Sequence, residues 1–142
     1  MLVLSRSLSL LSFDLFLYSP PLSSLISSIG PGASVKLWKE LFPHAELWEA
    51  EYNAGCVEKH RNTTLKGINV LVGDQENLEV LDSWVETSGG DFDVIIDDGG
   101  HTQCMIWNSF TKLWPTVKKG GLYFIEDLHV AKHPKFIRSN SD

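Results

Sequence analysis

Short apolar runs alternate with amphipathic stretches along most of the chain. The apolar runs predict strands at residues 25–29, 47–51, 67–72, 92–98 and 122–125. Apolar residues recur at three- and four-residue intervals between these runs, which predicts helices at residues 34–42, 53–61, 78–85 and 106–114. This alternation predicts an α/β fold, a Rossmann-like parallel sheet of about five strands with flanking helices.

The first 28 residues differ in composition from the rest. They contain nine serines and many leucines, and their only charged residues are Arg6 and Asp14. A secretory signal peptide needs an unbroken apolar centre, which the serines and Asp14 interrupt. We therefore expect residues 1–21 to be a separate segment, disordered or targeting, and residues 22–142 to form the folded domain.

No membrane span is expected near the N-terminus, because Pro20, Pro21 and the turn at residues 30–32 break any long helix. A cytoplasmic location is the expectation. A Ser-rich transit peptide and a replaced native N-terminus are the alternatives.

Length and charge narrow the class of protein. The chain has 142 residues, which suits one domain, and it carries 12 basic and 18 acidic residues for a net charge of −6. This balance argues against nucleic-acid binding, which needs clustered basic side chains. Cys56 and Cys104 are too far apart for a C-x-x-C site and are expected to be reduced, partly buried thiols.

Acidic residues follow four of the predicted strands. Ligands of open parallel sheets bind at the carboxyl ends of the strands, so the polar groups there are candidates for a site. They are Glu51; Asp74 with Gln75; Asp97 and Asp98 with His101; and Glu126 with Asp127.

The last two strand ends suggest a metal site. Neighbouring strands lie about 4.8 Å apart, so Asp98, Glu126 and Asp127 are expected to share a small volume. Carboxylates in contact repel unless a cation joins them, and hard oxygen ligands suit Mg²⁺, Mn²⁺ or Ca²⁺. His101 is placed to act as a proton acceptor. The alternatives are acids that cap helices or face water, and a surface histidine.

A glycine turn precedes the first predicted helix. Gly30 and Gly32 allow a backbone to approach a ligand closely, and Glu51 lies about twenty residues further on, where an acid grips ribose hydroxyls. This pair suits a dinucleotide or S-adenosylmethionine. A surface glutamate at a strand end is the alternative.

Two segments resemble one enzyme family. FDVIIDDGGH (92–101) and GGLYFIEDL (120–128) are similar to class I S-adenosylmethionine-dependent methyltransferases, and most similar to the metal-dependent sugar and natural-product O-methyltransferases of the macrolide-sugar and rhamnosyl type. The family's DDGSH signature has Gly100 in place of serine here. Residues 34–51 and VGDQ (72–75) extend the resemblance.

The resemblance implies an S-adenosylmethionine-dependent O-methyltransferase acting on the hydroxyl of a sugar or diol-like natural product. It implies that His101 is the general base and that a divalent cation, Mg²⁺ in most members, is held by Asp98, Glu126 and Asp127. The implied cofactor-binding residues are Gly30, Gly32, Glu51, Asp74, Gln75 and Asp97.

The chain also departs from the family. Ser27 and Ser28 stand where an acid usually ends the first strand, and the chain stops fifteen residues after Asp127, so we expect the fold to be truncated before its last strands. An exposed sheet edge favours a homo-oligomer. The main alternative function is a non-catalytic Rossmann-like remnant or interaction module that still binds the cofactor. A nicotinamide-dependent oxidoreductase is a third reading.

Overall fold

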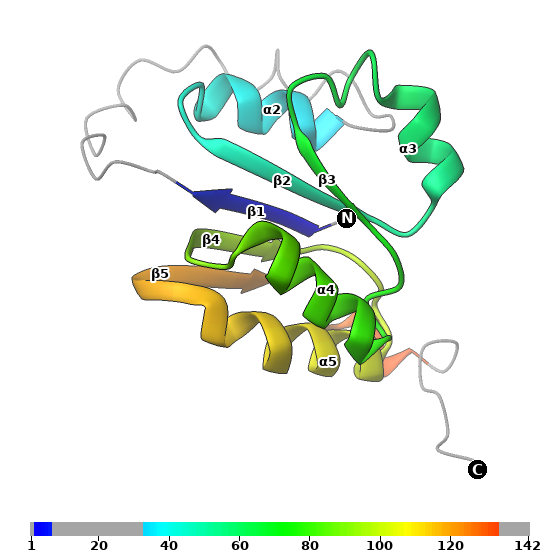
Figure 1. Ribbon diagram of the computed structural model, residues 1–142. Helices are drawn as coiled ribbons and strands as arrows, with labels where there is room; N and C mark the ends of the chain where they lie inside the picture. Colours follow the sequence, from blue (N-terminus) through cyan, green and yellow to red (C-terminus); the bar gives the residue numbers. More distant parts are fainter. Residues whose placement is uncertain (1, 7–32, 134–142) are drawn as a thin grey trace.

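The fold is a five-stranded sheet between two layers of helices, seen in a computed structural model that describes residues 2–6 and 33–133 (Figure 1). The strands are β1 (Leu2–Arg6), β2 (Glu46–Glu51), β3 (Asn69–Val72), β4 (Phe92–Asp97) and β5 (Val117–Ile125), in the order β3-β2-β1-β4-β5. The pairs β2–β3 and β4–β5 are parallel. The α/β class predicted from the sequence is therefore confirmed.

The central strand differs from the sequence expectation. The strand expected at residues 25–29 lies outside the described residues, and the centre of the sheet is β1, from the start of the chain. β1 runs antiparallel to both neighbours, and its Leu2 pairs with Ala50 on β2 and with Asp97 on β4. A central position offers hydrogen-bonding edges on both sides, so a run of only five residues gains two ladders there. No strand was predicted at residues 2–6, because the composition of residues 1–21 predicted a separate segment, disordered or targeting.

Three of the described helices begin directly after a polar capping residue. The helices are α2 (Ala33–Leu41), α3 (Ala54–His60), α4 (Leu78–Ser88) and α5 (Gln103–Leu113), with the short 3₁₀ helices η2 (Trp114–Thr116) and η3 (Val130–Lys132). Asn53, Asn77 and Thr102 cap α3, α4 and α5 with side-chain oxygens that accept backbone N–H bonds, each stabilising its helix by about 1 kcal/mol. Among the described helices, none is long and apolar enough to cross a bilayer.

The main core lies between the sheet and one helix layer. In Figure 1, α2 and α3 lie on one side of the sheet, and α4 and α5 lie on the other. Leu81 on α4 and both Phe92 and Ile95 on β4 are fully buried between the sheet and this second layer. They cluster with Leu71, Trp84 and Leu113. Each such side chain contributes about 1.5–3 kcal/mol through burial. The core fixes β3 and β4 against α4 and α5, and so fixes the loops that follow these strands.

Both cysteines are free and half-buried, as predicted.

Candidate metal centre

The candidate site lies where β4 and β5 end. In these adjacent parallel strands, Asp97 pairs with Ile125. Asp98 follows β4 directly, and Glu126 and Asp127 follow β5 directly. The two acid-bearing ends therefore meet at one edge of the sheet, as the strand-end rule predicts.

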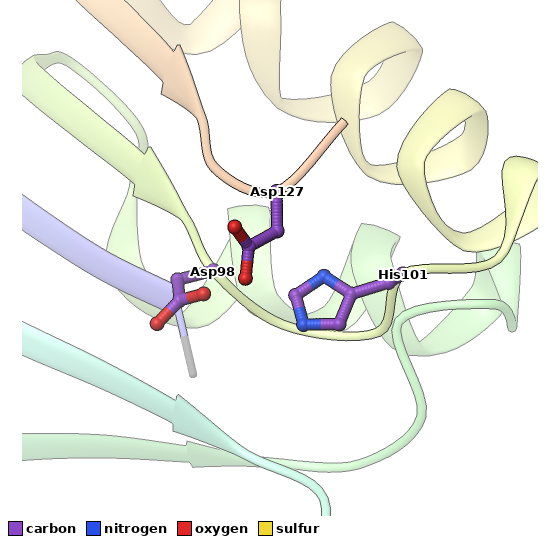
Figure 2. Close-up of side chains that lie close together, drawn as sticks. All are labelled: Asp98, His101 and Asp127. Atoms are coloured by element: carbon purple, nitrogen blue, oxygen red, sulfur yellow. The ribbon is translucent and has the colours of Figure 1, made fainter. Parts of the chain in front are cut away.

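Three side chains converge at this edge. One ligand atom each of Asp98, His101 and Asp127 lies within 4.8 Å of the other two, and Figure 2 shows the two carboxylates and the imidazole ring turned toward a common space. Asp98 and His101 are half-buried, and Asp127 is exposed. His101 reaches the group because it lies in the short loop between β4 and α5, immediately before the N-cap Thr102.

The backbone at Asp127 explains which acid of the β5 end joins the group. Asp127 has a φ of 53°, in the left-handed region that most side chains avoid, and its carbonyl oxygen accepts a hydrogen bond from the amide of Val130. This conformation bends the chain away from the strand direction and turns the Asp127 side chain toward Asp98 (Figure 2).

Glu126 is the neighbour of Asp127 in the chain. It is not one of the three described residues whose ligand atoms converge. Its side chain is exposed, but partial desolvation raises its pKa, and the charges of Asp98 and Asp127 raise it further. Glu126 is therefore within electrostatic reach of both carboxylates. Its predicted place as a cation ligand stays a prediction.

The donor set fits a small divalent cation. Two carboxylates this close repel each other, and a cation between them removes that repulsion. Carboxylate oxygens are the ligands that Mg²⁺ and Mn²⁺ prefer, and an imidazole nitrogen is compatible with Mn²⁺. Asp98 and Asp127 would hold the ion. The position of His101 allows it either to be a further ligand or to accept a proton beside the ion.

Asp97 occupies a different environment from its neighbour Asp98. It is only 2% exposed, and its carboxylate accepts hydrogen bonds from the Tyr123 hydroxyl at 3.0 Å, from the Ser109 hydroxyl, and from Gln75 Nε2 at 3.3 Å. Burial raises the pKa of Tyr123, and the charge of Asp97 adds to the rise, so the phenol stays a donor. The Asp97 carboxylate, predicted to lie beside the cofactor, is thus bonded inside the protein.

The sequence pattern had not pointed to Ser109 and Tyr123. Ser109 is fully buried on α5, three residues after Ile106, on the face that the apolar spacing assigned to the core. A hydroxyl on that face was the available signal, because a buried polar group needs a partner.

Glu51 and Asp74, two further predicted cofactor residues, lie along the same edge of the sheet. Glu51 ends β2, and its carbonyl oxygen accepts from the amide of Gly73 at 3.1 Å, so it lies next to the loop that carries Asp74. Glu51 Oε1 accepts from the amide of Asn53, and Asp74 Oδ1 accepts from the amide of Glu76, each at 2.9 Å. The structure thus places the end of β2 beside the loop that carries Asp74. Gly30 and Gly32 lie outside the described residues.

Sheet order and helix layers define a Rossmann-like α/β domain, and this domain matches part of a methyltransferase fold. MycE methyltransferase from the mycinamycin biosynthetic pathway, solved in complex with Mg, SAH and mycinamycin VI, superposes with a TM-score of 0.61 at 36% sequence identity. The match covers 74% of this chain and 26% of that one. A second crystal structure of MycE, with Mg and SAH, gives the same TM-score and identity.

Curated sequences give the same result. The chain is 37% identical over 105 residues to mycinamicin VI 2''-O-methyltransferase of Micromonospora griseorubida. It is 34% identical over the same length to demethylmacrocin O-methyltransferase of Streptomyces fradiae and to 8-demethyl-8-(2-methoxy-alpha-L-rhamnosyl)-tetracenomycin-C 3'-O-methyltransferase of Streptomyces olivaceus. Each match covers 74% of the chain. No protein-family model matches.

The chain is therefore a relative of the sugar O-methyltransferases of macrolide and tetracenomycin pathways, which confirms the resemblance predicted from the sequence. It spans about a quarter of the length of these relatives.

Proposed function

We propose that the chain carries the metal and cofactor region of an S-adenosylmethionine-dependent O-methyltransferase that acts on a hydroxyl of a sugar or diol-like natural product. The observation that supports this most strongly is the convergence of Asp98, His101 and Asp127 at the carboxyl edge of the sheet. Its relatives include O-methyltransferases of mycinamicin VI and of a rhamnosyl-tetracenomycin C. A solved relative, MycE, holds Mg and SAH.

Each group in the site has a chemical task in this proposal. Asp98 and Asp127, with Glu126 beside them, would bind a divalent cation such as Mg²⁺. Such a cation, when bound, lowers the pKa of a hydroxyl that it contacts and fixes its position. His101 would accept the proton from that hydroxyl.

The cofactor would lie along the other strand ends. Glu51 would bind the ribose hydroxyls, and Asp74, in the adjacent loop, would bind the adenine side; the contact between these two strand ends supports this assignment. Since the methyl group of a sulfonium is already electrophilic, the protein mainly has to align it with the acceptor oxygen. The role of Gly30 and Gly32 beside the methionine part stays a prediction.

A titration with two ligands tests the proposal. Calorimetry should detect binding of Mn²⁺ and of S-adenosylhomocysteine to the full chain, and methyl transfer to a panel of sugar diols should require the cation and stop with a chelator. Binding of both ligands without turnover on any diol would favour the non-catalytic alternative. Absence of cation binding would contradict the proposed metal centre.

A further inference from the structure

One side chain connects the loop after β3 to the loop that carries the candidate metal ligands. Gln75 Oε1 accepts a hydrogen bond from the backbone amide of Gly100 at 2.8 Å, and Gln75 Nε2 donates to Asp97 Oδ1 at 3.3 Å. Both polar atoms of this half-buried amide are thus used within the chain. These two bonds lie on either side of Asp98, in the segment formed by the last residue of β4 and the three residues after it, here called the 97–100 loop.

The fit around this amide is tight. A Cβ atom on Gly99 would lie 1.9 Å from Gln75 Oε1 and 2.9 Å from its Cδ, which is far inside van der Waals contact. Glycine at position 99 therefore lets the amide reach the backbone of the loop. The Gln75 amide therefore packs directly against the backbone of Gly99.

The partner at one end of the amide is itself fixed. Asp97 is buried, and its Oδ2 atom accepts hydrogen bonds from Ser109 on α5 and from Tyr123 on β5. A buried carboxylate that accepts several hydrogen bonds is held rigidly, because each lost bond leaves a charge unsatisfied. Gln75 therefore connects Gly100 to Asp97, a carboxylate that is itself bonded to both α5 and β5.

We propose that Gln75 is a positioning residue for the metal centre, acting through the 97–100 loop, rather than a group that binds the cofactor. By holding Asp97 and Gly100, it fixes the intervening Asp98 and sets the direction from which His101 enters the site. This inference rests on the proposed function. Groups that orient metal ligands typically change cation affinity 10-fold to 100-fold when removed.

The experiment compares Gln75→Met with Asn108→Ala in the full chain. Methionine keeps the length of the side chain and loses both hydrogen bonds. Asn108 Nδ2 donates to the carbonyl oxygen of Glu76 at 2.7 Å, so Asn108→Ala also removes a bond between α5 and the loop after β3 but leaves the 97–100 loop untouched. Calorimetric titration with Mn²⁺ should show about 10-fold to 100-fold weaker binding for Gln75→Met and unchanged binding for Asn108→Ala. Equal affinities in all three proteins, or an equal loss in both variants, would overturn the proposal.

Gly99→Ala provides a second route to the same change, because the added methyl group displaces the Gln75 amide without altering it. Gly99→Ala should reproduce the loss of Mn²⁺ affinity. Unchanged affinity would count against a positioning role for Gln75.

Hydrogen exchange separates this inference from the proposed function. The amide of Gly100 should be protected in the wild-type chain and should exchange at least about tenfold faster in Gln75→Met, whether or not the protein binds metal. An unchanged exchange rate would overturn the proposal that Gln75 holds the 97–100 loop. Wild-type protein that shows this protection but binds no Mn²⁺ would instead overturn the proposed metal centre.

Discussion

The backbone amide of Glu126 donates a hydrogen bond to the carbonyl oxygen of Asp97, at 2.9 Å. This bond continues the β4–β5 ladder one residue beyond the Asp97–Ile125 pair. The two acid-bearing strand ends therefore finish at the same level, which allows Asp98 and Asp127 to approach each other and His101. The alignment of the two strand ends therefore depends on the register between β4 and β5.

Asp98→Asn should remove cation binding and spare cofactor binding. The substitution keeps the shape of the side chain but removes one of the two converging negative charges. A cation present at 100 times its dissociation constant stabilises a protein by about 2.7 kcal/mol. We expect Mn²⁺ to raise the melting temperature of the wild-type chain and not that of the variant, while S-adenosylmethionine affinity changes less than about tenfold.

Glu86→Gln is the matched control for this measurement, since it removes an exposed acid on α4, away from the converging group. It should keep the full Mn²⁺ effect. An Asp98→Asn protein that is still stabilised by Mn²⁺ would contradict the assignment of Asp98.

His101→Ala distinguishes a base from a ligand. A general base contributes about 10²–10⁴ to the rate, so its loss should lower kcat by that factor while Mn²⁺ affinity stays close to the wild-type value. A ligand role predicts a large loss of Mn²⁺ affinity instead. Rapid-quench measurement of methyl transfer, together with calorimetry on the same protein, reads both quantities. Unchanged kcat and unchanged affinity would leave His101 without either role.

The sequence predicted the strand ends and their acids because both follow from local patterns. The apolar run before Asp97 and Asp98 has the length of a buried strand, and parallel strands bring their carboxyl ends to one edge. The choice between Glu126 and Asp127 was not predictable in this way, since it depends on the left-handed backbone at Asp127. Periodicity carries no information about a single φ angle.

Contacts between distant residues were also beyond the sequence pattern. Gln75 meets Gly100 across 25 positions, through the packing of the loops after β3 and β4. The pattern placed Gln75 correctly at a strand end, but a glutamine there suits a ligand or a loop contact equally well. The place of β1 was missed for a related reason: the pairing of Leu2 with Ala50 and Asp97 depends on which edges the rest of the sheet leaves open.

Substitutions at Asp127 should separate backbone strain from cation binding. A non-glycine residue in the left-handed region costs about 1–2 kcal/mol, and glycine has no such cost. Asp127→Gly should therefore raise the free energy of unfolding slightly in metal-free buffer, by up to about 1 kcal/mol, and abolish stabilisation by Mn²⁺. Asp127→Val should destabilise the protein. Urea unfolding with and without Mn²⁺ measures both effects, and an Asp127→Gly protein clearly less stable than wild type in metal-free buffer would contradict this account.

Glu49 should make the chain less stable as the pH rises. This residue on β2 is 5% exposed, and burial raises the pKa of its carboxyl from 4.5 to about 8, with the charge of Glu51 adding to the rise. Between these two pH values the unfolded chain has released the proton and the folded chain still holds it. Its contribution to stability is therefore complete at low pH and is lost with a slope that approaches about 1.4 kcal/mol per pH unit.

Glu49→Gln isolates this effect, because glutamine has the shape of the protonated acid and does not titrate. The difference in unfolding free energy between the variant and the wild type, measured with urea from about pH 5 to about pH 8.5, should shift progressively in favour of the variant as the pH rises. Glu40→Gln replaces an exposed acid on the nearby helix α2 and should give a nearly constant difference over the same range. A flat difference for Glu49→Gln would mean that the carboxyl is ionised in the folded protein at neutral pH, and that its surroundings stabilise the charge.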